Sequence, residues 1–245
     1  MASPALTAAL RRVDAVFDGM TAPADGCLHC YGAEELALLA TPRAPLGDDL
    51  ARQFFHKEPG HFGDHPAVLR RVLPEFLRYL ADGRFSGMGY APAGLGRVRW
   101  QEWPTEQAGA ITGFLDVWWR ETLADPEPPY GVGAVWELCV EIHQSLAPVH
   151  DVWAAAPRGG TADRHLADWV AYRIEDLLND DSSVLPWYVD LDGVLLPELQ
   201  AWLVEHAPAR LAGHPDPLLA RKVSLLALAE EERWPAYSEL VAGTD

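Results

Sequence analysis

The fold class of this chain is decided by residues 132–153, VGAVWELCVEIHQSLAPVHDVW. The apolar side chains in this stretch recur every three or four residues, at Val132, Val135, Trp136, Cys139, Ile142, Leu146, Val149 and Trp153. This spacing is the period of one face of an α-helix. Pro148 lacks the N–H of a helical hydrogen bond, so we expect a kink there. The stretch therefore predicts one long helix with a buried apolar stripe.

The same period extends outward from this stretch in both directions. It predicts helices over residues 4–20 and from Ala33, Asp48, Pro66, Pro104, Thr161, Pro197 and Asp216-Pro217. About eight to ten helices and few strands result, so the predicted fold class is all-α. Helices of similar length are consistent with a multi-helix array of stacked antiparallel helices, arranged as an irregular solenoid, although no motif repeats at a fixed period.

The length of the chain, 245 residues, is enough for one large domain with a buried core. We therefore predict a single all-helical domain over residues 1–245. Two segments are candidates for a subdivision. Residues 83–103 are rich in glycine and aromatic side chains without a sustained period, and residues 125–130 read Asp-Pro-Glu-Pro-Pro-Tyr.

The composition argues against several classes of partner. The 36 acidic residues outnumber the 19 basic ones and give a net charge of -17, and such a surface repels phosphate backbones. No apolar run reaches the roughly 18 to 20 residues of a membrane-spanning helix. The N-terminal residues also lack the apolar core of a secretory signal. We expect a soluble, cytoplasmic protein that binds neither nucleic acid nor membranes.

The motif Cys27-Leu28-His29-Cys30 carries the clearest chemical signal. Two thiols three positions apart can bind one metal ion or oxidise to a disulfide. A structural zinc ion takes four ligands, and the third cysteine, Cys139, belongs to a helical stripe. Further ligands must therefore be histidines, of which the nearest are His29, His56, His61 and His65. The candidate metal ligands are Cys27, Cys30 and His61, with zinc as the candidate ion; the alternative is a pair of packed thiols without a metal.

His56, His61 and His65 also form a group of their own around Pro59-Gly60, with Glu58 and Asp64 between them. Imidazole and carboxylate suit zinc, iron or nickel. The proline and glycine interrupt any helical face that would bring the three together, so we interpret them as exposed loop histidines.

The stretch from Trp187 to Leu195 contains Asp190-Leu191-Asp192-Gly193, which is similar to the nucleophile motif of haloacid-dehalogenase-like phosphatases. In those enzymes the first aspartate attacks phosphorus with magnesium bound nearby. The motif stands near the start of their doubly wound domain, whereas only a helical pattern follows it here. We therefore interpret it as an extended segment before a helix. The phosphate-binding, nucleophile-elbow and zinc-protease motifs are absent from the sequence.

The chain resembles an uncharacterised group of bacterial all-helical proteins with an N-terminal Cys-x2-Cys motif. Four motifs carry the resemblance: Cys27-Leu28-His29-Cys30, Ala33-Glu34-Glu35-Leu36, Phe62-Gly63-Asp64 and Val72-Leu73-Pro74-Glu75. It implies a helical fold and no known activity. The sequence departs from the pattern at Glu75, where a basic residue is expected, and at Phe62, where tryptophan is expected; His56 and His61 have no counterpart.

Two hypotheses about function follow from the sequence. The favoured one is a non-enzymatic helical protein whose acidic, tryptophan-rich surface binds another protein, as an adaptor or immunity-type factor. The alternative is a metal-binding protein or metal-dependent enzyme centred on Cys27, Cys30 and the nearby histidines. The sequence identifies no catalytic residue, substrate or oligomeric state.

Overall fold

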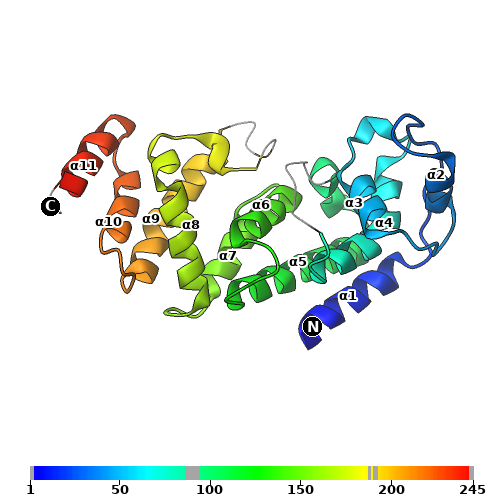
Figure 1. The fold of residues 1–245 in the computed structure, drawn as a ribbon, viewed down its shortest axis with the longest axis horizontal. Helices are drawn as coiled ribbons and strands as arrows, with labels where there is room; N and C mark the ends of the chain where they lie inside the picture. Colours follow the sequence, from blue (N-terminus) through cyan, green and yellow to red (C-terminus); the bar gives the residue numbers. More distant parts are fainter. Residues whose placement is uncertain (1–2, 86–93, 187–188, 190–192, 243–245) are drawn as a thin grey trace. The chain divides into compact units, whose positions relative to one another are not determined.

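The computed structural model describes residues 3–85, 94–186, 189 and 193–242. Within these residues the chain forms eleven α-helices, five short 3-10 helices and no β-strand (Figure 1). The predicted all-α class is therefore confirmed, while the solenoid-like stacking stays a prediction. Among the same residues, no helix combines the length and the apolar character needed to cross a membrane.

The chain separates into two compact units, Met1–Trp118 and Trp119–Asp245. The division falls inside helix α5 (Thr105–Ala124), outside both segments that we considered for a subdivision. Part of the first of those segments, residues 86–93, lies outside the described residues. The single domain over residues 1–245 stays a prediction.

The first unit is organised around one long helix, α4. Its α-helices are α1 (Pro4–Phe17), α2 (Ala33–Ala40), α3 (Asp48–His56), α4 (His65–Ala81) and most of α5, and its 3-10 helices are η1 (Pro59–His61), η2 (Gly94–Arg97) and η3 (Trp100–Glu102). α4 packs against α1, α2 and α3 (Figure 1). The buried ring of Phe55 on α3 stacks on Phe76 of α4 with a centroid distance of 3.6 Å. Such aromatic burial holds the two helices together.

Polar side chains of α4 fix the connection between α2 and α3. Glu75 accepts a hydrogen bond from the Leu46 N–H at 2.7 Å, and the Tyr79 hydroxyl donates to the Leu46 carbonyl, also at 2.7 Å. The Arg71 guanidinium donates to the Ala44 carbonyl. Burial raises the pKa of Glu75, which the Leu46 N–H partly offsets. The loop that leads into α3 is thus anchored by side chains of the central helix.

The start of α4 follows the signals in the sequence. The Asp64 carboxylate accepts a hydrogen bond from the Ala67 N–H at 2.9 Å, and Pro66 occupies the first turn, where its missing N–H has no helical partner to lose. The predicted start at Asp216-Pro217 is shifted. There Asp216 accepts from the Leu218 N–H in a turn, and α10 begins only at Leu219.

The second unit contains the remaining helices, and tryptophans fill its core. They are α6 (Val132–His143), α7 (Ala147–Ala155), α8 (Thr161–Leu178), α9 (Leu195–Leu211), α10 (Leu219–Ser224) and α11 (Glu230–Ala242), with η4 (Ser182–Val184) and η5 (Leu225–Ala227). α8, α9 and α10 lie side by side (Figure 1). Trp153 donates through Nε1 to the Ala162 carbonyl at 3.1 Å, and Trp119 donates to that of Val149 at 2.9 Å. The polar atoms of these buried indoles are therefore satisfied.

Residues 132–153 form two helices instead of one. α6 ends at His143, and Gln144 adopts the left-handed conformation with φ of 53°. α7 then begins at Ala147 with Pro148 in its first turn, where the proline removes no helical hydrogen bond. All eight residues of the apolar stripe are buried. The buried stripe is confirmed, and the prediction of one continuous helix is wrong.

Candidate metal centre

The three predicted metal ligands lie together in the first unit. Cys27, Cys30 and His61 each offer one ligand atom, and these atoms lie within 4.8 Å of one another. The Sγ of Cys30 is 3.5 Å from Nδ1 of His61. All three side chains are partly exposed. In the part of the chain that the structure describes, no other group of three histidine, cysteine or acidic side chains has this proximity.

A single helical turn places the two cysteines on the same side of the backbone. The Cys27 carbonyl accepts from the N–H groups of Cys30 at 3.0 Å and Tyr31 at 3.1 Å. Residues three apart on such a turn are neighbours, so the two thiols face one region of space. Gly32 follows as the N-cap of α2, and its N–H donates to Glu35 at 2.8 Å. The turn is therefore fixed at its end by the start of α2.

Backbone contacts bring His61 to the cysteines. The Cys27 N–H donates to the carbonyl of His61 at 2.9 Å. A second contact joins the same two segments, because the Gly63 N–H donates a hydrogen bond to the carboxylate of Asp25 at 3.4 Å. These contacts join the loop after α1 to the chain between η1 and α4. The position of His61 is therefore set by its main chain as well as by its side chain.

Two glycines allow this close approach. A Cβ atom on Gly26 would lie 2.5 Å from Cδ2 of Leu36 and 3.1 Å from the ring of Phe62. A Cβ atom on Gly63 would collide with the carboxylate of Asp25. Both closest contacts are with the ends of side chains, so a larger residue at either position would displace the side chain of Leu36 or of Asp25.

The centre rests on a cluster of three aromatic rings. Tyr31, which follows Cys30 directly, has its ring centroid 4.7 Å from that of Phe54 and 5.7 Å from that of Phe62. Burial raises the pKa of Tyr31, and the nearby Cys30 adds to this. The tyrosine therefore stays neutral and acts as part of the core beneath the thiols.

The surroundings of Cys27 favour its thiolate form. A hydrogen bond with His61, followed by backbone N–H groups of His29 and Cys30, lowers the pKa of Cys27 to about 6. Cys139 is different, because complete burial in the second unit raises its pKa. At neutral pH the sulfur of Cys27, unlike that of Cys139, therefore carries the negative charge that metal binding and nucleophilic reaction require.

This contrast gives a direct prediction for alkylation. In metal-free protein, Cys27 should react with iodoacetamide with a rate that rises through about pH 6, while an ordinary thiol follows a pKa near 8.5 and Cys139 stays unmodified. Mass spectrometry of peptides, sampled over about pH 5 to 9, measures both sites in one experiment. The variant His61→Gln should move the midpoint for Cys27 to higher pH. A midpoint near that of free cysteine in the unaltered protein would contradict this description.

The other nearby histidines do not join the group. His29 is exposed, and His56 packs edge-on against the rings of Phe55 and Phe76. His65 is buried and stacks on Phe62 with a centroid distance of 6.0 Å, and burial lowers its pKa. The interpretation of His56, His61 and His65 as exposed loop histidines is therefore wrong for His65, which is buried in the first turn of α4, and for His56, which is the half-buried last residue of α3.

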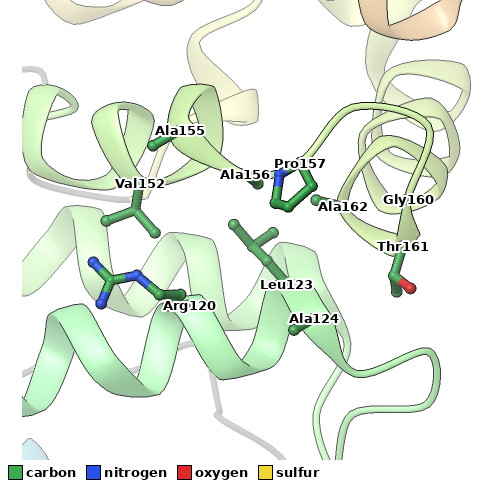
Figure 2. A pocket seen from close by; sticks show the side chains of 10 residues that line it. All are labelled: Arg120, Leu123, Ala124, Val152, Ala155, Ala156, Pro157, Gly160, Thr161 and Ala162. Carbon is green, nitrogen blue, oxygen red and sulfur yellow. The ribbon is translucent and has the colours of Figure 1, made fainter.

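A second candidate site, an apolar recess of about 290 Å³, lies in the second unit (Figure 2). It is lined by Arg120, Leu123, Ala124, Val152, Ala155, Ala156, Pro157, Gly160, Thr161 and Ala162. Arg120 is the one charged side chain among these, and none of them is a histidine, a cysteine or a carboxylate. Thr161 supplies the one hydroxyl of this lining, and none of the other lining side chains is an acid or base that could activate it.

The recess could not be located from the sequence, because α5, α7 and the start of α8 each contribute only part of it (Figure 2). The small residues of 154–162 are the only local signal. The phosphatase-like aspartates Asp190 and Asp192 lie outside the described residues.

Comparison of the chain with protein-family models, with curated proteins and with solved structures finds no match. The resemblance to bacterial helical proteins stays an expectation from the motifs in residues 27–75.

Proposed function

We propose that this is a zinc-binding protein whose ion is held by Cys27, Cys30 and His61. One observation carries the proposal: two segments that are far apart in the sequence place three ligand atoms within 4.8 Å of one another. The backbone bond from Cys27 to His61 supports it, because that bond holds the two segments together independently of any ion.

The donor set suits zinc better than other common ions. Two thiolates and one imidazole are soft or borderline ligands, whereas magnesium and calcium take oxygen ligands. Zinc bonds of about 2.0 to 2.3 Å require tetrahedral ligands to be roughly 3.3 to 3.8 Å apart. The 3.5 Å between Cys30 and His61 lies in this range. Small side-chain rotations bring the third ligand to the same spacing.

The site would leave one coordination position to solvent or to a further ligand. No other histidine, cysteine or carboxylate joins the three within the described residues, and all three are partly exposed. Structural zinc sites take four protein ligands, while three protein ligands leave an open position. We propose a metal-binding role without catalysis in the cytoplasm, where thiols stay reduced.

The protein-interaction function favoured by the composition stays a prediction. The large exposed apolar side chains among the described residues are Leu28, Tyr172, Val194 and Val241, and they belong to four different segments. Single exposed apolar residues are normal on soluble proteins. The geometry of the cysteine loop therefore supports metal binding more specifically than it supports an adaptor or immunity-type role.

Elemental analysis tests the proposal. Protein purified without a histidine tag should carry about one zinc ion per chain, and a chelator should lower its melting temperature, because the ion binds only the folded site. The double variant Cys27→Ser/Cys30→Ser should lose the zinc and melt at the lower temperature without a chelator. The matched control is Cys139→Ser, a thiol of the second unit, which should keep the zinc. Zinc retained by the double variant, or absent from the unaltered protein after growth with zinc, would refute the proposal.

A further inference from the structure

We infer that Cys27 and Cys30 are also a modification site, at which hydrogen peroxide forms a reversible disulfide that releases the metal. Disulfide formation needs the two thiols and the peroxide but no metal, whereas the release of metal rests on the proposed function. The inference starts from the positions of the three cysteines in the described residues.

The two thiols of the loop are close enough to react with each other. Their Sγ atoms lie within 4.8 Å, on one helical turn and on the same side of it. A disulfide has a sulfur–sulfur distance of about 2.05 Å, which rotations of two neighbouring side chains can reach. Both are partly exposed, so peroxide can reach them. Cys139 is 1% exposed and belongs to the other unit.

His61 lies beside both sulfurs of the pair. Its Nδ1 is 3.5 Å from the sulfur of Cys30, and the ligand atoms of Cys27, Cys30 and His61 lie within 4.8 Å of one another. An imidazolium beside a thiol stabilises the thiolate, the form that attacks peroxide. Either sulfur can therefore attack first, and the other sulfur then resolves the sulfenic acid.

The reaction proceeds in two balanced steps. One thiolate of the pair attacks one peroxide oxygen, so that a sulfur–oxygen bond forms, the oxygen–oxygen bond breaks and hydroxide leaves to become water. The second thiolate then attacks the sulfenic acid of the first, so that the sulfur–sulfur bond forms and a second hydroxide leaves as water. In total, two thiols and one hydrogen peroxide give one disulfide and two waters. The two electrons pass from the sulfurs to the peroxide oxygens.

Oxidation removes two of the three metal ligands at once. Disulfide sulfurs carry no negative charge and bind zinc poorly compared with thiolates, which leaves His61 as the one remaining ligand of the three. A single imidazole does not hold zinc against water. A dithiol reductant returns both thiols and with them the site.

The test uses the full-length protein loaded with zinc and treated with a small excess of hydrogen peroxide. Mass spectrometry should show the loss of two hydrogen atoms, located by peptide mapping to Cys27 and Cys30, with Cys139 still open to alkylation after unfolding. A coloured zinc indicator should report one equivalent of released metal at the same rate. Dithiothreitol should reverse the mass change. The variant Cys30→Ser cannot resolve, so dimedone should trap a sulfenic acid on Cys27.

The outcomes separate this inference from the proposed function. Zinc-loaded protein that forms no disulfide, or that goes directly to sulfinic acid at Cys27, overturns the inference and leaves the zinc function intact. A disulfide that forms while zinc stays bound overturns the release of metal. Protein that never binds zinc yet forms the reversible disulfide overturns the zinc function and supports the modification site alone.

Discussion

Replacing Arg210 by methionine is expected to destabilise the second unit by about 3–5 kcal/mol, the range for breaking a buried ion pair at one partner. Arg210 on α9 lies 2.5 Å from the carboxylate of Asp163 in the first turn of α8, and the two side chains are only 3% and 8% exposed. The guanidinium also donates to the carbonyls of Ala154 and Ala156 at the end of α7. Its loss leaves a buried carboxylate and two carbonyls without this partner.

Denaturant unfolding of the full chain, followed by tryptophan fluorescence, measures this loss. The matched control is Arg43→Met, which breaks an ion pair with Asp18 whose side chains are 72% and 51% exposed; its cost should be small compared with that of Arg210→Met, because water screens an exposed pair. The double variant Arg210→Met/Asp163→Leu should recover part of the loss, because it removes the unpaired charge. A cost for Arg210→Met no larger than that of the control would contradict the argument.

The second unit is also expected to lose stability on acidification because of His150. This imidazole is buried, with Trp202 stacked at 4.3 Å and Trp136 at 6.2 Å between ring centroids. Burial, and to a smaller extent the charge of His206, lowers the pKa of His150 to about 3. In the unfolded chain an ordinary histidine has a pKa near 6.5. Between these two values the unfolded state binds more protons than the folded state, so stability falls as the pH falls.

The size of this effect is about 1.4 kcal/mol for each pH unit below roughly 6.5. From neutral pH to about pH 4.5 the folded state should lose on the order of 2–3 kcal/mol through this residue. Denaturant unfolding at the two pH values measures it. The variant His150→Phe keeps a ring of similar size between the tryptophans but cannot take up a proton. Between these two pH values the free energy of unfolding of His150→Phe should fall by about 2–3 kcal/mol less than that of the unaltered protein, since the carboxylates titrate equally in both. Equal falls in the two proteins would contradict the prediction.

The sequence predicted a helix correctly where residues inside or next to that helix determine it. Pro66 marked the start of α4, and its apolar period marked the buried face. The break at Gln144 was not predictable in this way, because the apolar period continues across it from α6 into α7. A helix break that keeps the same side chains buried leaves no trace in the pattern of apolar residues.

Only the cysteine pair of the metal centre was predictable from the spacing of residues in the sequence. The spacing of Cys27 and Cys30 identified the pair, and the sequence named His61 among four possible histidines without a physical reason for preferring it. The selection is made by the backbone bond between Cys27 and His61. The ion pair of Asp163 and Arg210 was missed entirely, because its partners are 47 positions apart.

The distance along the chain between Cys30 and His61, 31 positions, has a consequence for the unfolded protein. A metal that joins them closes a loop containing α2 and α3. By analogy with disulfide cross-links, a closed loop of this size reduces the chain entropy of the unfolded state by an amount equivalent to about 3–4 kcal/mol. This contribution acts on the disordered chain and requires no additional packing in the folded one. The ion would therefore act as a removable cross-link, and its loss would loosen the first unit while leaving the hydrogen bonds within the second unchanged.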